Sequence, residues 1–156
     1  MTLKELRKSK GLTQIAAAKY LGIALRTYQN YESNINKQKG IQFEYMFEKL
    51  FKYGYIDENN GVLSIDKIRG ICLKVFSEFK VSYCYLFGSY AKGKATAKSD
   101  VDLLISTDID GLRFFELAEV LREELKKKVD LLDQRQLENN FVLTNEILKD
   151  GIKIYG

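Results

Sequence analysis

Residues 86–105 decide how the second half of the chain folds, and they read LFGSYAKGKATAKSDVDLLI. The β-forming run Val81–Phe87 predicts a strand that ends at the turn Gly88–Ser89. A connection of small residues and lysines then leads to a second predicted strand, Val101–Ile105. The stretch therefore predicts two strands joined by a short polar connection.

Three aspartates stand at the starts of predicted strands. Asp100 and Asp102 open the strand Val101–Ile105, and residues two apart on a strand share a face, roughly 6.5–7 Å apart. Asp130 repeats this context in Val129–Leu132, a third predicted strand that follows after one helix. If the second and third strands are neighbours, three carboxylates could hold two metal ions about 3.5–4 Å apart, the geometry for in-line displacement at phosphorus. Hard oxygen ligands favour Mg²⁺ or Mn²⁺.

The Gly88–Ser89 turn follows directly after a strand, so it presents backbone N–H groups and a hydroxyl that suit the phosphates of a nucleotide. Lys92, Lys94 and Lys98 add positive charge nearby. Each feature also has an ordinary structural explanation, because Gly-Ser is a common turn and Asp-x-Asp is often only a solvated pair. Their order and spacing together favour a phosphoryl-transfer site.

The rest of the second half alternates helical and extended patterns. Apolar residues recur at helical spacing over 64–79 and again over Leu112–Lys127. Further helical segments are expected around Gln134–Asn139 and Thr144–Lys149, followed by a short strand, Ile152–Tyr155. The order α-β-β-α-β-α-α-β predicts a small mixed-sheet α+β domain with flanking helices.

The first half reads differently, as short helices with no room for strands. We expect a multidomain chain: an all-α bundle over residues 1–55, a linker over 56–63, and the mixed-sheet domain over 64–156. The linker is expected because its stretch is polar and rich in Gly and Asn. The first 26 residues carry six Lys or Arg and one acidic residue, which is a possible nucleic-acid footprint or only a solvated helix face.

Composition excludes several classes of function. The 156 residues contain no histidine and only two cysteines, so imidazole-based hydrolysis and the common zinc sites are ruled out. No apolar stretch approaches the roughly 20 residues that cross a bilayer, and no signal-peptide core is evident at the start. We therefore expect a cytoplasmic protein with no membrane partner.

The spacing of the motifs resembles a known superfamily. Gly88–Ser89, Ser99–Asp100, Asp102 and Asp130 follow the signature of the DNA polymerase beta-type nucleotidyltransferases, with Lys92 in place of the usual Arg. The short domain is similar to the minimal nucleotidyltransferases that act as antitoxins beside HEPN ribonuclease toxins. The resemblance implies an enzyme that uses ATP and two Mg²⁺ ions, with Mn²⁺ as an alternative.

That resemblance also implies roles for single residues. Nucleotide binding falls to four of them: Gly88, Ser89, Lys92 and Ser99. Asp100 and Asp102 would hold Mg²⁺, and Asp130 would be the third carboxylate, at once metal ligand and general base. Because Lys cannot make the bidentate fork of Arg, the contact of Lys92 with phosphate would differ from that of the family.

Residues 2–53 resemble the lambda-repressor-like, Xre-type helix-turn-helix. The matching positions are Leu6, Arg7, Gly11–Gln14, Ala18, Leu21–Ile23, Thr27, Tyr28, Tyr31 and Glu32. In that family the third helix enters the major groove. The resemblance implies a DNA-contacting set of Gln14, Leu25, Arg26, Thr27 and Asn30, in which Arg26 could read guanine and Asn30 adenine.

Three functions are therefore open. The first is an antitoxin that transfers AMP to a hydroxyl, with tyrosine expected, of a HEPN toxin, and that binds its own promoter as an oligomer or a complex with the toxin. The second is a repressor whose nucleotidyltransferase half only binds nucleotide or toxin. The third is a nucleotidyltransferase that acts on a small molecule such as an aminoglycoside.

Overall fold

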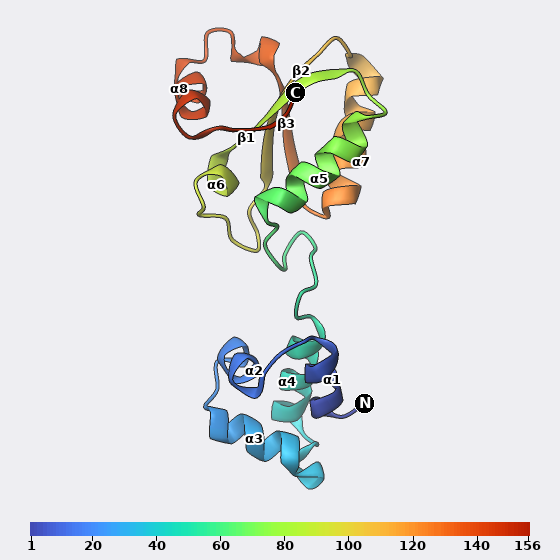
Figure 1. Cartoon of the computed structure of the whole chain (residues 1–156), viewed down its shortest axis with the longest axis vertical. Coiled ribbons are helices and arrows are strands. Elements are labelled where there is room, and N and C mark those ends of the chain that lie inside the picture. The colour runs from blue at the N-terminus through green and yellow to red at the C-terminus, as the bar shows by residue number, and fades with distance from the viewer. The chain divides into compact units, whose positions relative to one another are not determined.

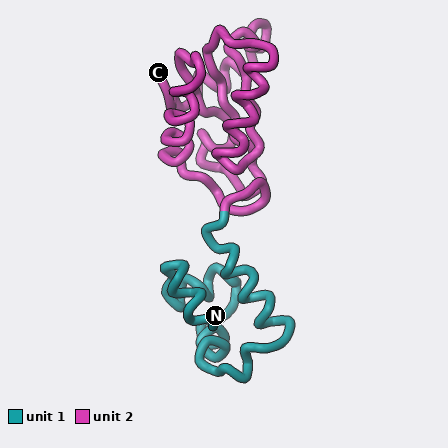
Figure 2. The backbone as a smooth tube through the Cα atoms, turned by 90° about the vertical axis from the view of Figure 1, so that its right-hand side faces the viewer, with its two compact units in different colours: residues 1–55 teal, residues 56–156 magenta.

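The computed structural model describes residues 1–156, and the chain forms two compact units (Figure 1, Figure 2). Unit 1 comprises Met1–Tyr55 and unit 2 comprises Ile56–Gly156. No helix in either unit combines the length and the apolar character that a membrane span requires.

Unit 1 is entirely helical, as the sequence predicts. It consists of α1 (Leu3–Ser9), α2 (Gln14–Leu21), α3 (Leu25–Ser33), a 3₁₀ turn (Ile35–Lys37) and α4 (Ile41–Phe51). Threonines cap the first two helices: the Thr2 hydroxyl accepts a hydrogen bond from the N–H of Glu5, and the Thr13 hydroxyl accepts one from that of Ala16. One buried cluster holds the helices together: Leu3, Leu6, Ala17, Ala18, Leu21, Tyr28, Met46 and Leu50.

Unit 2 is a mixed sheet with helices on both faces. Its elements are α5 (Ile65–Phe76), β1 (Val81–Phe87), α6 (Gly88–Ala91), β2 (Val101–Thr107), α7 (Gly111–Leu125), β3 (Val129–Asp133), a 3₁₀ turn (Gln134–Leu137), α8 (Phe141–Asp150) and β4 (Ile152–Tyr155). The predicted fold class is confirmed, and the short α6 follows directly after the first strand.

The sheet has the strand order β3-β2-β1-β4. β1 runs antiparallel to β2 and β4, whereas β2 and β3 are parallel and are joined by α7. α5 and α7 lie on one face of the sheet, and α6 and α8 lie on the other (Figure 1). The larger core fills the first face, and a smaller cluster around Phe87, Leu104 and Ile147 fills the second.

The expected linker, residues 56–63, is part of unit 2, so that expectation was wrong. Leu63 is buried in the core of the unit. The buried ammonium of Lys127 donates hydrogen bonds to the carbonyls of Asn60 (3.1 Å) and Gly61 (2.7 Å). Its third bond goes to Ala97 O at 2.6 Å. The segment is therefore fixed to unit 2 through its backbone carbonyls and Leu63, which its polar composition does not indicate.

Candidate active site

The bend after β1 is packed against the start of β2. The antiparallel register places Phe87 opposite Asp102, so the next residue, Gly88, lies beside the Asp102 side chain. Gly88 has a φ of +69°, and a Cβ atom at this position would lie 2.1 Å from Oδ2 of Asp102. Both the backbone conformation and the close approach require glycine here.

The parallel pairing of β2 and β3 brings Asp130 next to Asp102. The two residues are direct partners in the register, and neighbouring strands lie about 4.8 Å apart. Their side chains share the sheet face of Leu104 and Leu132, because strand residues alternate between faces. The second and third strands are therefore neighbours, as a site that includes Asp130 requires. Asp130 is exposed rather than directed into the core.

The pKa of Asp102 is raised, because this carboxyl is partly buried and lies near other carboxylates. Partial burial raises the pKa of this carboxyl to about 6, and the charges of Asp130 and Asp100 add to the rise. Glu146 raises it further, whereas the ammonium of Lys92 opposes the rise. A half-buried carboxylate among like charges is the environment that a bound cation would relieve.

The residues fit a magnesium ion that is shared with a nucleotide. No three acidic side chains stand close enough to hold one metal ion between them. Mg²⁺, however, commonly binds through one or two carboxylates together with substrate phosphates. Asp102 and Asp130 provide such a pair, and the exposed Asp100 lies two residues before Asp102.

Lys92 has a partner that the sequence did not predict. Its Nζ lies 2.8 Å from Oε1 of Glu146 on α8, and this contact raises the pKa of Lys92. Glu146 is one of many acidic residues on helices, and only the packing of α8 beside α6 gives it significance. The lysine that is expected to contact phosphate is therefore held by a carboxylate beside the aspartates.

The two serines of the predicted nucleotide site differ in their surroundings. Ser89 lies in α6 directly after Gly88, and its carbonyl accepts a hydrogen bond from the N–H of Lys94 at 2.9 Å. The hydroxyl of Ser99 instead accepts a bond from the N–H of Thr96 at 2.8 Å. Ser99 thus closes the turn that leads to Asp100.

In unit 1, three of the expected DNA-contacting residues are exposed on α3, namely Arg26, Thr27 and Asn30. Leu25 differs from the expectation, because it is partly buried and packs against the core of unit 1 rather than projecting from the helix. Gln14 is engaged within the unit: its Nε2 donates to Glu32 at 3.1 Å, and its Oε1 accepts from Gln29 at 3.2 Å.

The class of protein follows from comparison with known families. Residues 71–156 match the family described as "Polymerase beta, Nucleotidyltransferase", and residues 3–40 match "Helix-turn-helix". The chain belongs to the polymerase beta nucleotidyltransferase family, and it carries a helix-turn-helix unit before its nucleotidyltransferase unit.

Individual members of the family can be compared with this chain. The chain is 39% identical over 72 residues to "Putative protein adenylyltransferase MJ0128" of Methanocaldococcus jannaschii, a match that covers 44% of this chain and 74% of that protein. It is 34% identical over 79 residues to the protein adenylyltransferase MntA of Shewanella oneidensis, covering 49% and 55% of the two chains. A crystal structure of a toxin-antitoxin with AMP-PNP superposes with a TM-score of 0.50 at 29% identity, over 56% of this chain and 73% of that one.

Proposed function

We propose that the protein is a Mg²⁺-dependent adenylyltransferase antitoxin. It transfers AMP from ATP to a hydroxyl group, with tyrosine as the expected acceptor, on a HEPN toxin that is its partner. The observation that carries this proposal is the in-register pair Asp102–Asp130 beside Gly88. The names of the relatives support the nucleotide and the protein acceptor, since both names contain the words protein adenylyltransferase.

The chain's own residues have separate tasks in the reaction. Gly88 lets the backbone of the bend approach the nucleotide phosphates closely, and Ser89 adds a hydroxyl there. Asp102 and Asp130 would hold Mg²⁺ together with the nucleotide phosphates, with Asp100 as the third carboxylate beside them, and the ion when bound would offset the charge of the triphosphate and of the leaving pyrophosphate. Asp130 is exposed on the edge strand, so it can accept the proton of an arriving hydroxyl.

The reaction balances with these groups alone as proton carriers. The acceptor oxygen forms a bond to the α-phosphorus of ATP, and the bond between that phosphorus and the α–β bridging oxygen breaks. Pyrophosphate leaves, and the proton of the hydroxyl passes to Asp130. The absence of histidine from the chain leaves a carboxylate as the natural base.

The test is transfer of labelled AMP from ATP to the co-expressed HEPN protein, followed by mass spectrometry of the labelled side chain. Asp102→Asn and Asp130→Asn should each abolish labelling, whereas Asp108→Asn, an exposed aspartate beyond the other end of β2, should leave it unchanged. Full labelling by the first two variants would refute the assigned roles. Binding of ATP and of the HEPN protein without any transfer would instead support a repressor with a nucleotide-binding half.

Unit 1 is proposed to bind double-stranded DNA at the protein's own promoter. The exposed residues Arg26, Thr27 and Asn30 of α3 would lie in the major groove. One module has a small footprint, so binding would require a dimer or a complex with the toxin. Footprinting of the promoter with and without the toxin tests this arrangement.

A further inference from the structure

The edge of the sheet at β3 has backbone groups with no partner. β3 is the terminal strand, and the hydrogen bond from Val101 N to Lys128 O (2.9 Å) shows which of its residues face β2. Alternate residues face the same way, so the N–H and C=O groups of Val129 and Leu131 point to the open side. The N–H of Asp133 also points outward, but it donates to Oε1 of Gln136 at 2.8 Å.

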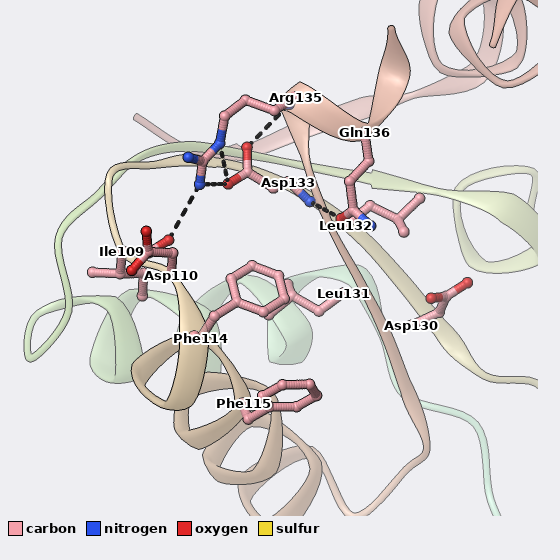
Figure 3. Close-up of a pocket in the computed structure, with 11 residues that line it drawn as sticks. Ile109, Asp110, Phe114, Phe115, Asp130, Leu131, Leu132, Asp133, Arg135 and Gln136 are labelled. Carbon is pink, nitrogen blue, oxygen red and sulfur yellow. Dashed lines mark hydrogen bonds and ion pairs between the residues drawn. The ribbon is translucent and has the colours of Figure 1, made fainter. Parts of the chain in front are cut away.

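A groove with an apolar wall runs along this edge, and Asp133 and Arg135 are among the polar residues that also line it. Phe114 and Phe115 of α7 and Leu131 of β3 line it, and its volume is about 620 Å³ (Figure 3). The side chain of Phe115 is 70% exposed. An uncovered aromatic residue beside unpaired strand edges is a surface suited to a further strand.

The two faces of the edge offer different chemistry. The carboxylate of Asp130 points away from Phe114 and Phe115, whereas Leu131 points toward them (Figure 3). A strand that pairs with β3 would place the side chain opposite Asp130 on the face of the carboxylates. Its two neighbours would enter the groove, because successive side chains of a strand alternate between faces.

We propose that the edge of β3, with the groove beside it, binds an extended segment of the acceptor polypeptide as a fifth strand of the sheet. The hydroxyl-bearing residue lies opposite Asp130, and apolar residues on both sides of it occupy the groove. This inference rests on the proposed function, because it takes Asp130 as the base that receives the hydroxyl proton.

The edge favours a substrate segment over a second copy of the chain. Only Val129 and Leu131 offer unpaired groups, and so short a pairing surface suits a segment that must leave after transfer. The groove is also continuous with the catalytic site, since Asp130 contributes to its lining. A bound strand therefore delivers its hydroxyl without any movement of the sheet.

Binding is tested on the full chain with a synthetic peptide, acetyl-Lys-Ser-Val-Tyr-Val-Ser-Lys-amide. Without ATP, amide hydrogen exchange followed by NMR should show new protection at the N–H groups of Val129 and Leu131. Two methylated peptides are compared, one N-methylated at both valine amides and the other at the tyrosine and serine amides. One of the two should lose binding and the other should keep it, because only alternate N–H groups of an added strand face β3. Absence of binding, or binding without that protection, would overturn the proposal.

A pair of variants tests the groove. Phe115→Asp should weaken peptide binding about tenfold or more, because the aromatic surface that a bound peptide would cover is lost. Phe141→Asp is the matched control, since Phe141 is 79% exposed on α8 and lies outside the groove. Equal binding by the two variants would refute the role of the groove.

Two further outcomes are informative. One distinguishes a substrate segment from a second copy of the chain at the edge, and the other distinguishes this inference from the proposed function. Protection of Val129 and Leu131 that grows with protein concentration alone, together with a doubled mass in solution, would assign the edge to a second copy and overturn this inference. Peptide binding with the expected protection but no transfer of AMP in the presence of ATP and Mg²⁺ would support the docking edge and refute the proposed function.

Discussion

Replacement of Asp102 by asparagine should stabilise unit 2 at neutral pH while it abolishes nucleotidyl transfer. The raised pKa of Asp102 means that the unfolded chain releases this proton near pH 3.8, whereas the folded chain keeps it up to about pH 6. Between these values the folded state binds more protons. The free energy of unfolding therefore falls as the pH rises through this window, and the loss is complete above it.

The size of the effect follows from the shift. A rise from 3.8 to about 6 corresponds to about 3 kcal/mol at about 1.36 kcal/mol per pKa unit. The side chain is partly exposed, so solvent screening reduces this to about 1–2 kcal/mol. Asparagine keeps the shape of the side chain and carries no charge, and it should recover this amount above pH 6.

The assay is urea denaturation in metal-free buffer at pH 4, 6 and 8. Because the chain has two units, unfolding is followed through NMR amide signals of β1 and β2. The stability advantage of Asp102→Asn should be small at pH 4 and fully developed at pH 8. Asp108→Asn, at an exposed aspartate outside the carboxylate site, is measured alongside it as the matched control. An advantage that does not change with pH, or that is absent at pH 8, would refute the idea that charge crowding destabilises the site.

Three other outcomes are expected. Gly88→Ala should lower the rate of AMP transfer on the order of 10²-fold, because its Cβ displaces the Asp102 carboxylate, and an unchanged rate would contradict the close approach. Lys127→Met should cost about 1–3 kcal/mol in urea denaturation, since the partly buried carbonyls of Gly61 and Ala97 lose the ammonium donor, whereas that of Asn60 keeps the N–H of Asp57; wild-type stability would argue against that role. Arg26→Ala should weaken promoter binding by about 1–3 kcal/mol in a titration while transfer stays unchanged, and parallel loss of both would contradict the division of labour between the units.

Much of the fold can be predicted from local patterns, and the exceptions have physical causes. The helix expected over Leu112–Lys127 ends at Leu125, because Lys126 adopts a left-handed φ of 55°. No glycine stands there to indicate the end of the helix in the sequence. That turn directs Lys127 into the interior, where its ammonium meets the carbonyls of 60–61. A lysine at the end of a helix is usually solvated. The sequence therefore predicts neither the left-handed turn at Lys126 nor the attachment of residues 56–63 to unit 2.

In the candidate site, too, some features follow from local sequence patterns and others depend on how distant elements pack. The neighbouring positions of Asp102 and Asp130 could be expected, because a strand, a helix and a second strand usually form a parallel pair. The ion pair of Lys92 with Glu146 depends on where α8 packs, and no spacing rule reports that. The roles of the three aspartates in catalysis stay predictions until the variants are measured.

The buried ammonium of Lys127 has a practical consequence for anyone who wishes to study the enzyme half in isolation. A fragment cut at the apparent composition boundary, beginning at Ser64, would lack two of the three acceptors of that cation and would also lose Leu63 from the hydrophobic interior. Such a truncation should yield insoluble or inactive material for reasons unrelated to catalysis. Expression should instead start at Ile56, so that the whole second unit is retained.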